Sequence, residues 1–182
     1  PCYTPGDYVL YVGRLSREKG IPTLLAAMRE LPIPLAIVGD GPMRDTLEMY
    51  VRQHAMAHRV TFHGYQTGES LRQLYQGAAF LVIPSEWYEN APMTVLEAFA
   101  YGKPVIGARI GGIPEMIEPG TSGLLVAPGD GDALRDAINT LWTSRSSLAE
   151  MGHAGRQAVL TRFSPQRHVD ELLALYRRAI AA

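Results

Sequence analysis

Two carboxylates, Glu89 and Glu97, stand eight positions apart in the stretch SEWYENAPMTVLEAF, residues 85–99. Pro92 between them suits the first position of a helix, where its missing N–H costs nothing. The amides of Met93 and Thr94 would then be unpaired donors at the positive end of the helix dipole. Glu97 would lie about 7 to 8 Å further along the axis. The pattern predicts an anion site with a carboxylate on each side.

Carboxylates do not bind phosphate, but they accept hydrogen bonds from hydroxyls. A ligand with hydroxyls on both sides of a phosphate group is a nucleotide sugar, and we interpret the stretch as a site for one. The alternative is that Glu97 only complements the helix dipole and that Glu89 is solvated. We interpret Trp87 and Tyr88, on the same loop, as packing or loop anchors rather than groups that stack on a ligand.

A cationic loop, GRLSREKG at residues 13–20, carries Arg14, Arg17 and Lys19 directly after an apolar run. Converging cations at the end of a strand suit a phosphate, because arginine offers forked hydrogen bonds and lysine a point charge. Solvated surface charge is the alternative. The loop is not a P-loop, since its glycines are too far apart and no Gly-Lys-Ser/Thr occurs.

Two glycine-containing loops are less specific. Residues 38–42 hold Gly-x-Gly, but Arg44 stands where a dinucleotide fingerprint has its third glycine. We therefore interpret this loop as a tight strand-to-helix turn in which Asp40 could cap the helix near Pro42. The pair Gly111-Gly112 either lets a ligand approach the backbone or only makes a turn.

The elements that must position these loops are short apolar runs alternating with helical patterns. We expect strands at 8–12, 35–38, 60–63, 80–83, 105–106 and 124–126, and final helices at 130–142, 147–162 and 165–180. Continuous apolar strands separated by helices indicate a parallel sheet covered on both faces. The sequence thus predicts an α/β fold, a Rossmann-like doubly wound parallel β-sheet of about six strands followed by C-terminal helices. Ligands bind such sheets at the carboxyl ends of the strands.

Composition gives few further constraints. The chain has 182 residues, a formal net charge of −1 and one cysteine. It therefore suits one well-cored domain without an internal disulfide and with no global attraction to nucleic acid. His54 and His58 stand four apart on an expected helix face without a third ligand, so we interpret them as surface residues and expect no metal site. The opening PCYTPG has neither an initiator Met nor a signal-peptide pattern. We expect a cytoplasmic piece of a longer chain.

Six motifs occur in a recognisable order: VGRLSREKG (12–20), IVGDGP (37–42), PSEWYENAPMTVLEA (84–98), GKPVI (102–106), GGIPE (111–115) and GLLVAP (123–128). In this order and spacing they resemble the C-terminal, donor-binding domain of the retaining GT-B glycosyltransferases of family 4. The resemblance covers nearly the whole chain. Members of that family often have Gly-Phe-Gly-Leu after the first Glu, where this chain has Asn-Ala-Pro-Met.

The resemblance implies a role for each matching position. Arg14 and Lys19 would neutralise the donor diphosphate as the leaving group gains charge, and Glu89 would hold the hydroxyls of the donor sugar at the reacting face. The other donor-binding positions that it implies are Gly13 in the first loop, Gly64 and Tyr65 at the base, Asn90, Ala91 and Pro92 along the sugar, Met93 and Thr94 at the phosphate, and Glu97 at the ribose hydroxyls.

The resemblance also implies an activity and a missing half. A UDP-, GDP- or ADP-sugar would donate its sugar to an acceptor hydroxyl with retention, without a metal or other cofactor. Residues 1–182 would be a single nucleotide-sugar-binding domain, and the N-terminal acceptor domain would be absent. We therefore expect the fragment to bind nucleotide sugar weakly and to transfer no sugar. Any peripheral membrane association would come only through that domain.

Two other functions stay open. One is a nucleotide-sugar epimerase of the same architecture, for which no distinctive acid–base pattern is found. The other is a non-catalytic nucleotide-binding module, against which the intact Arg14, Lys19, Glu89 and Glu97 argue. The last expected helix carries an apolar stripe at Val169, Leu172, Leu173 and Tyr176. This stripe either packs near the absent domain or forms part of the core.

Overall fold

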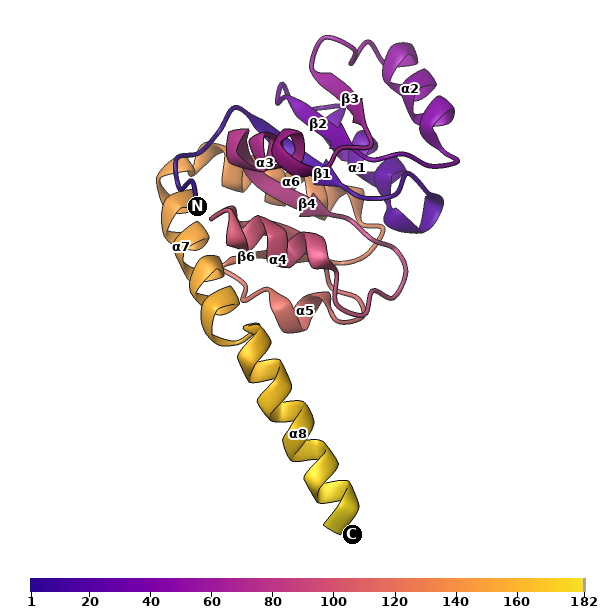
Figure 1. Cartoon of the computed structure of the whole chain (residues 1–182). Coiled ribbons are helices and arrows are strands. Elements are labelled where there is room, and N and C mark those ends of the chain that lie inside the picture. The colour runs from indigo at the N-terminus through magenta and orange to yellow at the C-terminus, as the bar shows by residue number, and fades with distance from the viewer. Residues whose placement is uncertain (182) are drawn as a thin grey trace.

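A computed structural model describes residues 1–181 and contains one parallel six-stranded sheet (Figure 1). The strands are β1 (Tyr8–Val12), β2 (Leu35–Val38), β3 (Val60–Gly64), β4 (Ala78–Ile83), β5 (Val105–Ala108) and β6 (Gly123–Val126). Their order in the sheet is β3-β2-β1-β4-β5-β6. The prediction of a Rossmann-like doubly wound sheet is confirmed.

Helices cover both faces because the strand residues alternate between two cores. Val9 of β1 packs in a core with α1 (Ile21–Met28), α2 (Arg44–Gln53) and α6 (Gly131–Thr143). Leu10, its neighbour, packs on the opposite face with α3 (Gly68–Gly77), α4 (Met93–Ala100) and α5 (Ile113–Met116). The central strands are thus buried on both sides, which explains why their sequences are continuously apolar.

The sheet order places a switch point between β1 and β4. The chain passes from β1 outward to β2 and β3, and then returns to add β4 on the other side of β1. The loops that leave the carboxyl ends of β1 and β4 therefore diverge to opposite sides. A crevice at such a point is where open α/β sheets bind ligands.

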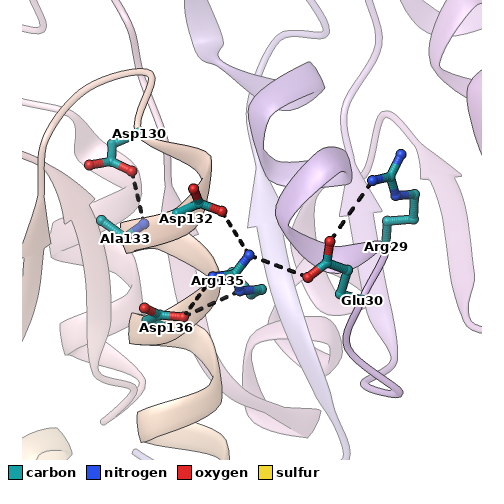
Figure 2. Close-up of polar contacts among 7 residues, drawn as sticks. All are labelled: Arg29, Glu30, Asp130, Asp132, Ala133, Arg135 and Asp136. Carbon is teal, nitrogen blue, oxygen red and sulfur yellow. Dashed lines mark hydrogen bonds and ion pairs between the residues drawn. The ribbon is translucent and has the colours of Figure 1, made fainter.

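A polar network on the surface joins α6 to the end of α1 (Figure 2). The guanidinium of Arg135 lies 2.7 Å from Asp132 and 3.3 Å from Glu30, which follows α1. Asp130 caps α6 by accepting a hydrogen bond of 2.9 Å from the Ala133 amide. Exposed ion pairs contribute little, so the apolar contacts between α1 and α6 hold the two helices together.

The two C-terminal helices differ in their surroundings. α7 (Arg145–Thr161) packs on α4, and a Cβ on Gly155 would lie 2.4 Å from the ring of Phe99. α8 (Pro165–Ala181) instead projects away from the domain (Figure 1), and its apolar stripe is exposed. The interpretation of this stripe as part of the core is therefore wrong for the described chain.

Candidate functional site

Two adjoining pockets lie at the carboxyl ends of β1, β2 and β4. The larger, of about 550 Å³, is lined by residues from the loops after β1, β2 and β3, among them Arg14, Asp40 and Tyr65. The smaller, of about 260 Å³, is lined mainly by the loops after β1 and β4. Val12, Gly13 and Thr94 line both pockets. These three residues form a shared wall across which one ligand could reach into both spaces.

The loop after β2 packs directly on the loop after β1. Gly39 has φ 132°, and a Cβ there would lie 1.9 Å from the carbonyl oxygen of Gly13. The Leu15 amide donates to the Asp40 carbonyl at 2.9 Å. The tight turn expected here is confirmed, but the expected cap is not. The Asp40 carboxylate accepts from the Gly41 amide at 2.7 Å, and α2 starts after Met43 without a side-chain cap.

The cations of the first loop divide between the pockets. Arg14 is exposed and lines the larger pocket, and its guanidinium forms no ion pair within residues 1–181. Lys19 ends a 3-10 turn (Arg17–Lys19) and lines the smaller pocket. Arg17 lines neither. The alternative of solvated surface charge therefore holds for Arg17, whereas Arg14 and Lys19 each line a pocket.

The start of α4 lies at the shared wall. Pro92 is the residue before the helix, with ψ 115°, so the expectation that it occupies the first helical position is wrong by one residue. Met93 and Thr94 are the first two helical residues, and the Val95 amide donates to the Pro92 carbonyl at 3.0 Å. The amides of the first helical positions have no carbonyl acceptor inside the helix. Because Met93 and Thr94 hold those positions, the predicted donors remain at this site.

The two carboxylates fall into different pockets. Glu89 lines the smaller pocket, where it accepts from the Ser85 hydroxyl at 2.8 Å and from the Lys19 ammonium at 2.5 Å. Its side chain is only 17% exposed. Glu97 lines the larger pocket and accepts from the Tyr75 hydroxyl at 2.7 Å. The alternative that Glu89 is merely solvated does not hold.

A pair of glycines fixes the backbone that carries Glu89. The Gly112 amide donates to the Glu89 carbonyl at 2.7 Å, and a Cβ on Gly112 would lie 1.8 Å from the Asn90 carbonyl oxygen. The close approach that these glycines permit is therefore between two protein segments. The loop between β5 and α5 acts as a support behind the loop between β4 and α4.

Two buried tyrosines support the pockets, and the sequence interpretation did not assign either of them. The Tyr11 hydroxyl donates to the Arg14 carbonyl at 3.0 Å, which fixes the turn behind that arginine. Burial, followed by the charges of Glu89 and Glu18, raises the pKa of Tyr11. Burial and the Glu97 carboxylate raise the pKa of Tyr75. Both hydroxyls thus stay protonated and act as donors at neutral pH.

The remaining predicted residues are only partly brought to the pockets. Tyr65 lines the larger pocket and is 76% exposed, whereas Gly64 ends β3 and is not among the lining residues. Pro92 and Met93 line the smaller pocket. Asn90 and Ala91 are exposed and line neither pocket in this structure.

Two expectations concern residues outside the pockets. Trp87 and Tyr88 are exposed, and their rings meet edge to face with centroids 6.4 Å apart, so neither is packed in the core. His54 follows the last residue of α2 and His58 lies in the next turn, so they do not share a helix face.

Two features are absent from residues 1–181. No group of three or more His, Cys, Asp or Glu side chains there could hold a metal ion. No helix in that range has the length and apolar character needed to cross a membrane.

The sequence and the fold both match known proteins. The family model of the glycosyl transferases group 1 matches residues 3–158. An uncharacterized glycosyltransferase of Methanocaldococcus jannaschii is 32% identical over 176 residues, which cover 94% of this chain and 45% of that protein. The chain thus spans less than half the length of this curated relative.

Two solved structures are similar in both sequence and fold. Sucrose-phosphate synthase from Thermosynechococcus elongatus matches with a TM-score of 0.86 and 36% identity, covering 97% of this chain and 46% of that one. HepE from Anabaena, solved in complex with UDP, matches with a TM-score of 0.84 and 26% identity, covering 94% of this chain and 50% of that one.

Proposed function

The chain belongs to the glycosyl transferases group 1 family, and from that membership we propose that it is the donor-binding half of a retaining glycosyltransferase. The whole enzyme would move a sugar from a nucleotide diphosphate sugar to an acceptor hydroxyl. The two adjoining pockets carry this proposal, because the start of α4 lies on their shared wall, Glu97 lines the larger pocket and Glu89 lines the smaller.

The dimensions and chemistry of the pockets suit the parts of such a donor. A space of about 550 Å³ is within the range of small-molecule sites and suits a nucleoside. Glu97 would accept from the ribose hydroxyls there, and Tyr65 would border the base. The diphosphate would cross the shared wall at the amides of Met93 and Thr94. The sugar would enter the smaller pocket, where Glu89 accepts from its hydroxyls.

Charge governs the chemical step that we propose. Cleavage of the glycosyl–phosphate bond gives an oxocarbenium-like sugar and a diphosphate with more negative charge. Arg14, Lys19 and the helix amides would stabilise this charge without a metal ion. Retention would follow if the acceptor attacks the same face and the leaving phosphate takes the acceptor's proton. Asn90 and Ala91 would reach the sugar only after a small movement of their loop.

The proposed nucleotide part of the donor rests on the chemistry of the pockets and on the similarity to a solved structure. The related HepE was solved in complex with UDP, which supports UDP as a candidate beside GDP and ADP. Calorimetric titration of the chain with UDP, GDP, ADP and their sugars tests the site. Arg14→Ala and Glu97→Ala should each weaken the tightest complex, whereas Arg17→Ala in the same loop should not. Absence of binding, or equal affinities in all variants, would contradict the assignment.

The partner that we propose is an acceptor-binding domain that precedes this one in the whole enzyme. The chain spans less than half of the Methanocaldococcus jannaschii relative. In addition, α8 carries an exposed apolar face that this domain does not cover. That face would pack against the other half. The 182 residues alone should therefore transfer no sugar, and measurable turnover by them would contradict this arrangement.

A further inference from the structure

Tyr75 is the only side chain that holds the Glu97 carboxylate among residues 1–181. Its hydroxyl donates to Oε2 at 2.7 Å, and no hydrogen bond reaches Oε1 within this range. Tyr75 is 1% exposed, so the donor itself cannot be reached by a ligand. One oxygen of Glu97 is thereby fixed from behind, while the other is left to accept hydrogen bonds from the larger pocket.

The ring of Tyr75 is itself held in place. It stacks on Tyr101, with ring centroids 5.1 Å apart and an interplanar angle of 15°. The Tyr8 hydroxyl donates to the carbonyl of Leu74, the residue before Tyr75, at 2.8 Å. The hydroxyl that reaches Glu97 thus comes from a position anchored to β1 and to the residue that follows α4.

The hydrogen bond between Tyr75 and Glu97 joins two helices that border the pockets. Tyr75 belongs to α3, which begins just after the segment Tyr65–Thr67 that lines the larger pocket. Glu97 belongs to α4, whose first turn lies at the shared wall of the two pockets. The hydrogen bond between them is a direct link between the helix behind the proposed base site and the helix that starts at the proposed phosphate site.

We propose that Tyr75 is a positioning residue that fixes Glu97 for a pair of vicinal hydroxyls on the ligand, and so makes the site selective for a ribose diol. This proposal rests on the proposed function, because the diol is that of the bound nucleotide. A free glutamate side chain would lose rotamer freedom on binding, whereas one already held by Tyr75 loses little. A hydroxyl donor behind the carboxylate also leaves its remaining lone pairs directed to the pocket.

The pKa of Tyr75 is raised, which agrees with this role. Burial, and next the negative charge of Glu97, disfavour the tyrosinate. The hydroxyl therefore remains a donor over the whole neutral range.

Tyr75→Phe tests the proposal, because phenylalanine keeps the ring and its stacking and removes only the hydroxyl. Titrations use the tightest binder among UDP, GDP and ADP together with its 2′,3′-dideoxy counterpart, which lacks both ribose hydroxyls. We expect Tyr75→Phe to weaken the ribose nucleotide about threefold to tenfold and to leave the dideoxy nucleotide unchanged. Tyr101→Phe is the matched control, since its hydroxyl makes no hydrogen bond within residues 1–181, and it should change neither affinity.

A double-mutant cycle with Glu97→Ala separates positioning from general packing. In the Glu97→Ala background the Tyr75→Phe change should have no further effect on the ribose nucleotide. Two outcomes would overturn the role of Tyr75 and leave the proposed function intact. In one, Tyr75→Phe weakens binding of the ribose and the dideoxy nucleotide equally. In the other, Tyr75→Phe does not weaken binding of the ribose nucleotide although Glu97→Ala does. If the unaltered chain binds none of the three nucleotides, the proposed function and this inference both fail.

Discussion

The Lys19 ammonium lies 2.5 Å from one carboxylate oxygen of Glu89, although 70 positions separate the two residues in the chain. The Ser85 hydroxyl reaches the same oxygen at 2.8 Å. A cation and an acid are thus joined at the smaller pocket, while Arg14 beside the larger pocket has no ion pair within residues 1–181. The positive charge of Lys19 is partly neutralised before any phosphate arrives.

Glu89→Gln should strengthen binding of a nucleoside diphosphate that carries no sugar. The change removes one negative charge near the proposed phosphate site and frees the Lys19 ammonium from its ion pair. A charge interaction of about 1 kcal/mol at 4 Å in a water-like medium corresponds to roughly a fivefold gain. Calorimetry at low salt measures this, and added salt should reduce the gain.

Glu86→Gln is the matched control for that experiment. Glu86 lies on the same loop, accepts a hydrogen bond from the Thr23 hydroxyl and lines neither pocket. It should leave the affinity for the diphosphate nearly unchanged. Weaker binding in Glu89→Gln would show that Glu89 assists the phosphate site rather than opposing it.

Gly112→Ala should destabilise the chain and damage the smaller pocket. The new Cβ would lie 1.8 Å from the Asn90 carbonyl oxygen, so the segment that carries Glu89 must move. Overpacking of this kind costs about 1 to 3 kcal/mol, which in a chain of this size lowers Tm by about 2 to 4 °C for each kcal/mol. Differential scanning calorimetry measures the shift.

Gly131→Ala provides the comparison for the glycine experiment. Gly131 begins α6, and a Cβ there would approach nothing closer than 3.9 Å. The free energy of unfolding of the Gly131→Ala variant should stay the same or rise slightly, because alanine restricts the unfolded chain. The prediction for Gly112 would be contradicted if both substitutions shifted Tm equally.

The sequence was sufficient for the fold because its signals are local. Continuous apolar runs of strand length define the buried strands, as Leu35–Val38 illustrates, and the apolar spacing of 130–142 matches α6 almost to the residue. The helix start between Glu89 and Glu97 was also predictable, because proline and the following periodic apolar residues mark such a position. Only the role of Pro92 shifted, from the first helical residue to the one before it.

Contacts between residues far apart in the sequence could not be predicted from local sequence patterns. Nothing near Lys19 in sequence indicates a partner at Glu89, and nothing near Tyr75 indicates one at Glu97, because both pairs form only once the fold brings distant segments together. The glycine pair that includes Gly112 indicated a close backbone contact, but the sequence did not identify the group in contact. A glycine pair indicates that a backbone approaches closely, and only the structure shows that the approaching group is the Asn90 carbonyl.

Deletion of residues 165–182 should leave the stability of the remaining domain almost unchanged. The side chains of α8 from 165 to 180 are exposed, so their removal uncovers little apolar surface of the domain. Thermal unfolding of the shortened chain should agree with that of the full chain within about 0.5 kcal/mol, as for surface changes.

A longer deletion that starts at Arg145 is the contrasting case. It also removes α7, including the buried Leu148, and uncovers Phe99 beside Gly155. Loss of these contacts should destabilise the domain by several kcal/mol, since truncating a single large core side chain already costs about 2 to 5 kcal/mol. A large loss of stability from the shorter deletion would show that α8 packs on its own domain in solution.

Stability should fall as pH rises above about 10, and Tyr75→Phe should make this fall shallower. Burial raises the pKa of Tyr75 in the folded chain above its ordinary value of 10.0, which the unfolded chain keeps. Above pH 10 the unfolded state therefore binds fewer protons, and each such tyrosine lowers the free energy of unfolding by about 1.4 kcal/mol per pH unit.

Urea unfolding between pH 9 and pH 11.5 measures that slope. Tyr11, whose pKa is also raised, remains in the Tyr75→Phe variant, so the variant should keep part of the alkaline loss. Lys103 is buried and has a lowered pKa, which acts with the opposite sign below pH 10.5, but it is present in both proteins and cancels in the comparison. Tyr176→Phe, on the exposed face of α8, should keep the unaltered slope. Identical slopes for Tyr75→Phe and the unaltered chain would mean that the Tyr75 hydroxyl does not stay buried against Glu97 in solution.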